Sequence, residues 1–417
     1  MTRQCDILII GAGIVGVCSA WYLTQAGYRP LVIDRGEVAG GSSHANAGLL
    51  VPSSWTPMAA GNGIEQLLEK WQDPEASIYL PASGDPHLSD WRRRLRAAAE
   101  PIQWLKTTAV LHRLAGRSVE LYRELHRELS LQDHFRMDGS LNVFSTQAGF
   151  RQGATQALRH RSMGGIAALL DRSGVRHYLP QAADKIVGAV LFPEDGRLSP
   201  KAFVQSLAHE AGQHGAEFWS HVTVTGIGGI DDGQITSVTT STEDIEFDVA
   251  VLAAGAWSGA LGRDWGLNVP VVPGRGYSYT MARPEGFPDF GVQLIDEGVA
   301  VNPMGERLRI AGRVEFTGMD DRVDGMRAAQ VARASRDLLG LDPRPEDGQP
   351  WMGFRPMTPD GLPIVDWSIK YENLLLACGH NKIGMTLGPA TGELVARRIT
   401  GTPAGPDDAA LALNRFA

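Results

Sequence analysis

Apolar residues stand in short unbroken runs at some places along the chain and alternate with polar residues at others. Residues 7–10, 31–33 and 374–378 are unbroken apolar runs, and the segment at 247–255, apolar from Val249 onward, ends in glycine. Runs of this length are typical of strands that are buried on both faces of a parallel sheet. Small and apolar residues between the first two runs predict a helix, so residues 5–34 predict a strand, a helix and a strand.

The alternating pattern belongs to other parts of the chain. Residues 139–146 alternate as a half-buried strand does, and residues 269–315 alternate like an antiparallel sheet. Ser199 and Pro200 have the residue types that begin a helix. The other expected elements are helices within 60–135, at 151–172, 200–213, 326–340 and 388–399, and strands at 217–227 and 234–241.

This order of elements predicts an α/β protein in which two domains interleave. We expect residues 1–55, 199–262 and 350–417 to form a discontinuous Rossmann-like domain. Residues 56–198 and 263–349 are expected to form a second domain with a mainly antiparallel sheet. The length of 417 residues supports this division, because it exceeds the size of one ordinary domain.

Composition narrows the class of protein. A formal net charge of −8 and 21% charged residues fit a soluble, mildly acidic protein, and no lysine or arginine run predicts binding of nucleic acid. Residues 92–96, Arg-Arg-Arg-Leu-Arg, are interpreted as a solvated helix face, with contact to an anionic membrane surface as the less favoured interpretation. Three cysteines give no disulfide framework and favour a reducing compartment, so we expect a cytoplasmic protein. No apolar run reaches the roughly 18 residues of a membrane span, so any membrane association is expected to be peripheral, at the inner face. No metal site is expected.

The first strand and helix carry the motif Gly11-Ala12-Gly13-Ile14-Val15-Gly16. The glycines permit a tight turn, close approach of a pyrophosphate and close packing of helix on strand. Unpaired N–H groups at the helix N-terminus favour the negative phosphates. Asp34, 18 residues after Gly16, ends the second strand and is expected to accept hydrogen bonds from a ribose. The motif therefore predicts a dinucleotide without saying which one.

Three further parts of the chain combine with this motif. They are the loop at 41–48 (Gly-Ser-Ser-His-Ala-Asn-Ala-Gly), the segment at 251–258, and the pair of segments at 353–363 and 379–386. In this order the four parts resemble the FAD-dependent D-amino-acid oxidase family, which includes D-amino-acid dehydrogenases, glycine oxidase and sarcosine oxidases. The loop at 41–48 is most similar to the dehydrogenase branch.

The resemblance implies a non-covalently bound FAD. Sarcosine oxidases attach FAD through a cysteine where this chain has Gly353, and the spacing after His44 is one residue longer than in relatives that attach FAD through a histidine. Arg35 is expected along the adenine edge, and a 2′-phosphate partner in an NADPH enzyme is the alternative. The residues expected to contact the cofactor are Gly11, Gly13, Ile14, Val15, Gly16, Asp34, Arg35, Ser42, Ser43, Asn46, Ala47, Gly48, Leu49, Val224, Ala254, Gly255, Gly379, His380, Ile383, Gly384, Met385 and Thr386.

The resemblance also implies how an amino acid would bind and react. Arg355 occupies the Gly-x-Arg-Pro position that resembles the carboxylate-binding arginine of the family, and an arginine fork matches a carboxylate. Tyr277 is expected to share that carboxylate, with a core tyrosine as an equally good interpretation. Arg313 is a less favoured candidate for the same site, because many relatives have a small residue there. Asp195 carries no assignable motif.

The expected reaction is hydride transfer from the Cα of a D-amino acid to flavin N5, giving the imino acid and then the 2-oxo acid. A cyclic substrate of the D-proline or D-hydroxyproline type would give a cyclic imine. The electron acceptor is a quinone, another carrier or oxygen. The alternatives are a glycine/sarcosine-type oxidase, an NADPH-dependent reductase, and the FAD subunit of a multi-subunit amino-acid dehydrogenase.

Overall fold

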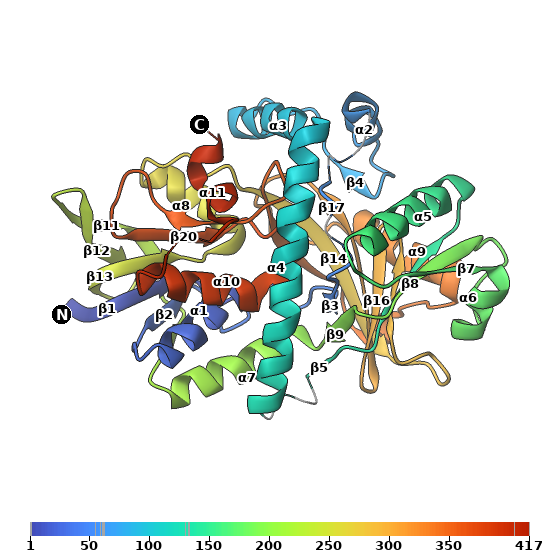
Figure 1. Ribbon diagram of the computed structural model, residues 1–417, viewed down its shortest axis with the longest axis horizontal. Helices are drawn as coiled ribbons and strands as arrows, with labels where there is room; N and C mark the ends of the chain where they lie inside the picture. The colour runs from blue at the N-terminus through green and yellow to red at the C-terminus, as the bar shows by residue number, and fades with distance from the viewer. Residues whose placement is uncertain are drawn as a thin grey trace.

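The protein is described by a computed structural model that covers residues 2–416 except 55, 59, 61, 62, 130, 132, 133 and 404. Two large sheets lie side by side along the long axis of the molecule, and a small sheet lies between them (Figure 1). The small sheet contains β3 (Leu49–Leu50), β9 (Gly196–Leu198) and β5 (Phe135–Arg136).

The first sheet has a parallel block at its centre. In this block β1 lies between β2 and β13, and each of these neighbours continues the parallel order with one more strand. Along its other edge, β13 pairs with the antiparallel β12 at its start and with the parallel β20 at its end. The strands are β1 (Thr2–Ile10), β2 (Leu31–Asp34), β10 (Glu217–Ser220), β11 (Val224–Asp231), β12 (Gln234–Thr240), β13 (Asp244–Leu252), β19 (Ile364–Trp367) and β20 (Leu374–Cys378).

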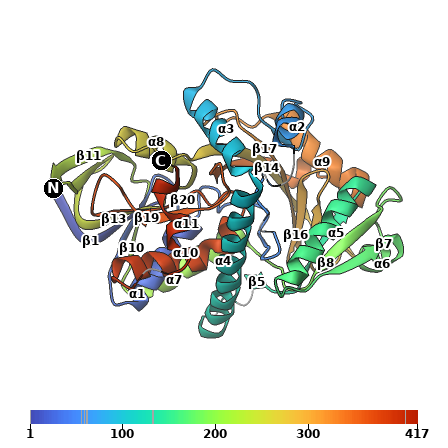
Figure 2. The ribbon, with the colours of Figure 1, turned by 45° about the horizontal axis from the view of Figure 1, so that its top comes forward.

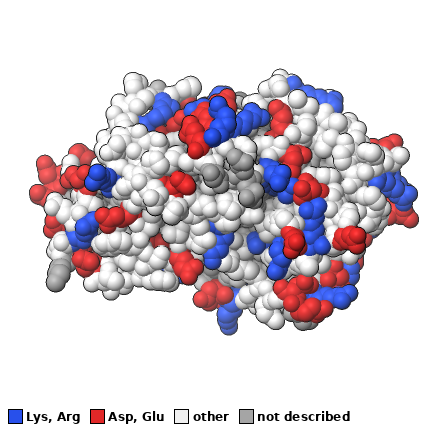
Figure 3. Space-filling model, turned by 90° about the horizontal axis from the view of Figure 1, so that it is seen from below, with Lys and Arg blue, Asp and Glu red and all other residues white. Residues whose placement is uncertain are grey.

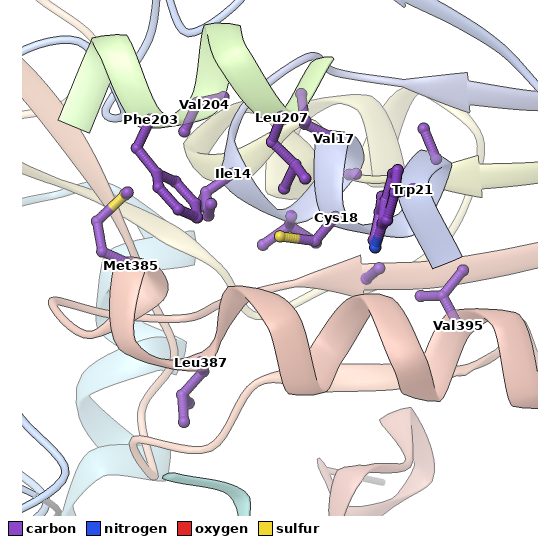
Figure 4. Packing of buried hydrophobic residues seen from close by; sticks show 14 of the residues in the cluster. Ile14, Val17, Cys18, Trp21, Phe203, Val204, Leu207, Met385, Leu387 and Val395 are labelled. Carbon is purple, nitrogen blue, oxygen red and sulfur yellow. The ribbon is translucent and has the colours of Figure 1, made fainter. Parts of the chain in front are cut away.

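Helices cover this sheet with a dense apolar layer. The layer contains α1 (Ile14–Gln25), α7 (Pro200–Gln213), α10 (Gly384–Ile399) and the long α4 (Pro101–Glu128). Figure 4 shows Cys18 and Trp21 of α1 between Leu207 of α7 and Val395 of α10. A Cβ on Gly392 would lie 2.5 Å from the backbone carbon of Cys18, so glycine lets α10 approach α1 this closely. α4 crosses α10 in both ribbon views (Figure 1, Figure 2).

The second sheet is antiparallel except where β15 pairs with β6 and β17 pairs with β4. α9 (Gly325–Leu339) packs on β17 and β14. The strands, in spatial order, are β18 (Trp351–Met357), β14 (Val272–Ala282), β17 (Arg307–Glu315), β16 (Val299–Met304), β15 (Gly291–Leu294), β6 (Ser140–Phe144), β8 (Gly188–Phe192) and β7 (Ala168–Asp171), with β4 (Ile78–Tyr79) beside β17. The other α-helices are α2 (Ile64–Lys70), α3 (Pro86–Ala98), α5 (Gln147–Ser162), α6 (Arg172–Tyr178), α8 (Ser258–Asp264) and α11 (Asp408–Leu411).

This architecture confirms the predicted α/β fold class with a mainly antiparallel second sheet. The three segments expected to build the Rossmann-like domain supply every described strand of the first sheet, but the last of them also supplies β18 to the second sheet. The division into two domains stays a prediction.

Some predicted bounds were wrong. The helix expected at 151–172 ends at Ser162, and β7 and α6 follow it. The strand expected at 217–227 is two strands, β10 and β11. The helix expected from 388 begins at Gly384, because the early glycines pack against α1 instead of ending the helix.

The basic side chains of α3 bind partners in the same protein. Asp90 pairs with Arg93 and Arg94, Glu65 pairs with Arg96, and Arg92 donates to the carbonyl of Leu80. On the face drawn in Figure 3, basic and acidic side chains are interspersed. None of the described helices combines the length and the apolar character that a membrane crossing requires.

Candidate active site

A cavity of about 1140 Å³ lies where the carboxyl ends of β1, β2, β13 and β20 face the second sheet. Crevices at the carboxyl ends of parallel strands are the usual ligand sites of such folds, and this one exceeds the roughly 300–1,000 Å³ of common small-molecule pockets. All the residues expected to contact the cofactor line it except Gly16, Gly379 and Thr386. The structure therefore gathers residues from both ends of the chain around one space, whereas their roles stay predictions.

The glycine turn after β1 keeps the N-terminus of α1 open to the cavity. Gly11 has a φ of 115°, and a Cβ there would lie 2.4 Å from the carbonyl oxygen of Ala253. Gly16 lets α1 pack closely on this turn, since an added Cβ would lie 1.8 Å from the carbonyl oxygen of Gly11. α1 has no side-chain cap and no acidic residue in its first turn, so its positive end suits an anion.

Asp34 and Arg35 follow β2 at the rim of the same space. The carboxylate of Asp34 accepts hydrogen bonds from the N–H of Ala12 at 2.7 Å and of Gly36 at 2.8 Å. A carboxylate offers about four lone-pair positions, so Asp34 can still accept from a ribose. The guanidinium of Arg35 lies 4.5 Å from the ring centre of Trp257.

The loop at 41–48 is fixed by its own polar side chains. Ser43 Oγ accepts from the N–H of Ile14 at 3.0 Å, which leaves the hydroxyl proton free for an anion at the helix end. Asn46 donates to the carbonyl of Ser42 at 2.9 Å and accepts from the N–H of Gly48 at 2.7 Å. The loop backbone is therefore held in one conformation at the cavity wall.

Residues of the second sheet hold the same loop, and sequence reasoning missed them. Ser278 Oγ donates to the carbonyl of Ala45 at 2.7 Å. Arg309 Nη1 donates to the carbonyl of Asn46 at 3.1 Å. Asn302 donates to the carbonyl of Ala47 and to that of Leu198, each at 2.9 Å. The one signal in the sequence is Asn302, a polar residue within the otherwise apolar β16.

At the other end of the chain, α10 also opens on the cavity without a side-chain cap or an early acidic residue. Pro389 has no N–H to donate to the carbonyl of Met385, four residues earlier. Tyr122 of α4 supplies the missing donor, with its hydroxyl 2.5 Å from that carbonyl oxygen. Thr386 Oγ1 accepts from the N–H of Val51 at 3.0 Å, which ties α10 to the segment after the 41–48 loop.

The ring of His380 is buried against Thr391 of α10. Its Nε2 lies 2.8 Å from Thr391 Oγ1, and the residue is 2% exposed. Burial lowers the pKa of His380 to about 3, so the ring is neutral at neutral pH. His380 therefore orders the loop.

A buried carboxyl group links the cavity wall to β6. Asp195 accepts from the N–H of Ser53 at 3.1 Å, from Ser53 Oγ at 2.8 Å and from Ser140 Oγ at 2.6 Å. Burial raises the pKa of Asp195 to about 7 despite these donors. Ser54, the residue after Ser53, lines the cavity, so the hydrogen bonds of Asp195 to Ser53 fix this part of the cavity wall.

The end of the cavity that faces the second sheet carries three cationic residues. Arg355 of β18 donates from Nη1 to the carbonyl of Arg313 on β17 at 3.0 Å. Burial lowers the pKa of Arg355 to about 10, which leaves it charged at neutral pH. Burial and the nearby Arg355 lower the pKa of Lys382. A Cβ on Gly276 would lie 1.8 Å from Arg355 Nη1, so glycine makes room for this guanidinium.

Tyr277 does not reach this space, which corrects its predicted position. Its side chain is 1% exposed, and its hydroxyl donates to Glu315 at 2.5 Å in the apolar core of the second sheet. Tyr279 packs against the same core, as the alternation predicts. Ser278, on the opposite face of β14, is the residue that faces the 41–48 loop.

Comparisons with known proteins agree with this geometry. The family described as FAD dependent oxidoreductase matches residues 6–398. The chain is 32% identical to a D-amino acid dehydrogenase of Agrobacterium fabrum, over 99% of this chain and 100% of that protein. It is 33% identical to a D-amino acid dehydrogenase of Methylobacterium nodulans, over 95% of each.

Solved structures share the fold. Glycine oxidase from Geobacillus kaustophilus superposes with a TM-score of 0.76 at 23% identity, over 99% of both chains. L-proline dehydrogenase from P. horikoshii superposes with a TM-score of 0.75 at 20% identity, over 100% of this chain and 98% of the other. With the family match across most of its length, the chain belongs to the family of FAD-dependent oxidoreductases.

Proposed function

We propose that this chain oxidises a D-amino acid to its imino acid with FAD. The observation that carries the proposal is Arg355, whose guanidinium lines the cavity and forms no ion pair with any described carboxylate. An unpaired arginine at the substrate end suits the carboxylate that every amino acid carries. The relatives named D-amino acid dehydrogenase match this chain over nearly their full length, and their name supports the D configuration of the substrate.

The residues present fit FAD. The open N-termini of α1 and α10 lie on the same cavity and neither has an acidic residue in its first turn, so negative groups of a ligand would be stabilised at both. Asp34 and the 41–48 loop would hold the adenosine and diphosphate parts, and the N-terminus of α10 would face the flavin. When bound, FAD accepts the hydride that leaves the substrate Cα.

The chain itself would act by orientation. Arg355 would hold the carboxylate so that Cα is presented in one geometry, and alignment of this kind is a large part of catalysis. His380 has no role as a base, since its ring is buried against Thr391. The substrate therefore reacts as the neutral amine, and its imine hydrolyses after release to a 2-oxo acid and ammonia. A cyclic D-imino acid would leave as a cyclic imine.

A non-covalent cofactor is part of the proposal. Cys378 lines the cavity, but burial raises the pKa of its thiol to about 12, so no reactive thiolate is offered there. Acid precipitation of the purified protein should release all the flavin into the supernatant. Flavin that stays with the precipitate would contradict this part.

We further propose that electrons pass to a carrier or quinone in preference to oxygen. The name dehydrogenase, printed for the relatives, supports this choice. The location in the cytoplasm and a peripheral contact with the inner face of the membrane stay predictions. Sedimentation with vesicles that contain anionic lipid tests the contact.

The decisive experiment is anaerobic bleaching of the flavin by matched D- and L-amino acids, glycine and sarcosine. We expect bleaching by D-amino acids, and loss of substrate affinity in Arg355→Met with flavin retained. Bleaching by glycine or sarcosine alone would indicate the amine-oxidase alternative. Absence of bleaching by any of them would overturn the proposal.

A further inference from the structure

We propose that the preferred substrate is an acidic D-amino acid, and that Arg313 binds its side-chain carboxylate. This inference rests on the proposed function, because it places the α-carboxylate at Arg355. Arg313 lies beside that site: it lines the cavity on β17, and its carbonyl oxygen accepts the hydrogen bond from Arg355 Nη1 at 3.0 Å.

The charges at this end of the cavity are unbalanced. Arg313, Arg355 and Lys382 all line it, and among the described residues none of the three forms an ion pair. The acidic residues that line the cavity are Asp34, Glu37 and Asp264, and all of them belong to the side of the first sheet. Glu75 and Glu297 are near enough to act electrostatically on Arg313, but they do not line the cavity or form an ion pair with it.

Two buried arginines elsewhere in the protein have carboxylate partners, whereas Arg309 of β17 has only the neutral oxygens of Thr280 and Asn46 as acceptors. Arg197 pairs with Asp138 at 2.7 Å, and Arg327 pairs with Glu315 at 3.1 Å. A buried charge without a partner is costly, so the fold supplies a carboxylate or neutral hydrogen-bond acceptors. Arg313 and Arg355 are half-buried and Lys382 is exposed to the open cavity, and none of the three is paired with a described carboxylate, so this end of the cavity suits a ligand that brings more than one negative group.

The polar atoms of Arg313 are only partly used. Nη1 donates to the carbonyl of Glu75 at 2.8 Å, which holds the side chain in place. Nε is buried and has no hydrogen-bond partner among the described residues. Ser77 and Gly298 line the cavity beside it, so a carboxylate there would have polar and small neighbours.

The backbone of Arg313 indicates that this side chain is not incidental. Its φ is 61°, a left-handed conformation that is strained for any residue other than glycine. Arg313 follows Gly312, and its N–H donates to the carbonyl of Gly298 at 3.1 Å. This hydrogen bond holds the strained conformation. Glycine would relieve it, yet the position holds an arginine that faces the substrate end.

The two carboxylates of one substrate would thus have separate partners. Arg355 would take the α-carboxylate, with Lys382 adding to the positive potential there. Arg313 would take the distal carboxylate. Substrates with a cationic side chain, such as D-lysine, would be repelled from the same place.

Isosteric pairs test the inference on the holoenzyme. D-Glutamate and D-glutamine differ by one charge at constant shape, as do D-aspartate and D-asparagine. We expect the kcat/KM for the better acid to exceed that for its amide by at least tenfold, and this ratio to fall to about one in R313Q and in R313G. R313G removes the strain as well as the charge, so loss of the preference in a stable R313G protein excludes misfolding as its cause. R307Q, an exposed arginine on the same strand, should keep the ratio.

A binding measurement without turnover supplies the second readout. The Kd of glutarate, measured from the flavin spectrum, should be at least tenfold lower than that of its monoamide, and R313Q should abolish the difference. If neutral D-amino acids bleach the flavin and the acids are no better, the inference fails and the proposed function stands. If no D-amino acid bleaches it, the proposed function fails. A ratio unchanged in R313Q would show that Arg313 has only a structural role.

Discussion

Replacement of Gly276 by alanine is expected to lower activity strongly and stability only modestly. Gly276 of β14 pairs with Gly353 of β18, two residues from Arg355. An added Cβ would lie 1.8 Å from Arg355 Nη1, far inside contact distance, so the flexible guanidinium must move. It then loses its bond to the carbonyl of Arg313 and its proposed place beneath the substrate carboxylate.

The size of the effect follows from the interaction lost. A hydrogen bond to a charged group contributes about 1.5–3 kcal/mol, and about 1.4 kcal/mol corresponds to a factor of ten. We therefore expect kcat/KM of G276A to fall about 10- to 150-fold, mainly through KM. Alanine inside a strand is more stable than glycine by about 0.5–1 kcal/mol, which offsets part of the hydrogen bond that Arg355 loses, so the free energy of unfolding should fall by no more than about 2.5 kcal/mol.

Anaerobic stopped-flow reduction of the flavin measures the first quantity, and urea denaturation measures the second. G226A is the matched control, because Gly226 lies in β11 with no atom within 4 Å of an added Cβ. It should leave kcat/KM unchanged. A value for G276A within twofold of the wild type would refute the reasoning about Arg355.

Three other substitutions test the supports of the site. In Tyr122→Phe the carbonyl of Met385 loses its donor, so the free energy of unfolding should fall by about 1–3 kcal/mol in urea denaturation; a change below about 0.5 kcal/mol would mean that the carbonyl finds another donor. Asp195 has a folded pKa of about 7, above its ordinary value, so its contribution to the free energy of unfolding should fall as pH rises from about 4 to about 7 and then level off, against the opposite contribution of His380, whose pKa is lowered to about 3. Asp195→Asn should lose this dependence, and urea midpoints across pH 4–9 that keep the wild-type slope would contradict it. In Asn302→Asp a carboxylate faces two carbonyls, so the Kd of FAD should rise at least about tenfold in a fluorescence titration. Asn142→Asp, where the side chain accepts from an amide, should leave the Kd nearly unchanged.

The parts of the site that depend on local backbone geometry could be predicted from the sequence. Gly11, Gly16 and Asp34 lie in one strand–helix–strand unit, and each constraint on them comes from residues nearby or from the adjacent strand. The family resemblance added Arg355, whose surroundings the structure now describes. Its role in binding stays a prediction.

The parts that depend on the face of a strand could not be predicted. Alternation placed Tyr277 and Tyr279 on one face of β14, correctly, but both faces of this strand are covered, so the pattern has no polar side to mark the cavity. Ser278 therefore faces the 41–48 loop instead. Asn302 reaches a carbonyl 255 positions away in the sequence, a contact that no local pattern indicates.

The central place of β1 in the first sheet bears on how the protein is made. Its parallel neighbour β13 ends at Leu252, and the cavity is closed by residues 377–385, so the cofactor site does not exist until nearly the whole chain has left the ribosome. At about 5–20 residues per second, roughly 20–75 s pass between the synthesis of the apolar first strand and the synthesis of the last part of the cofactor site. Flavin therefore joins a finished chain, and truncation before β20 should abolish cofactor binding even though the complete glycine motif is present.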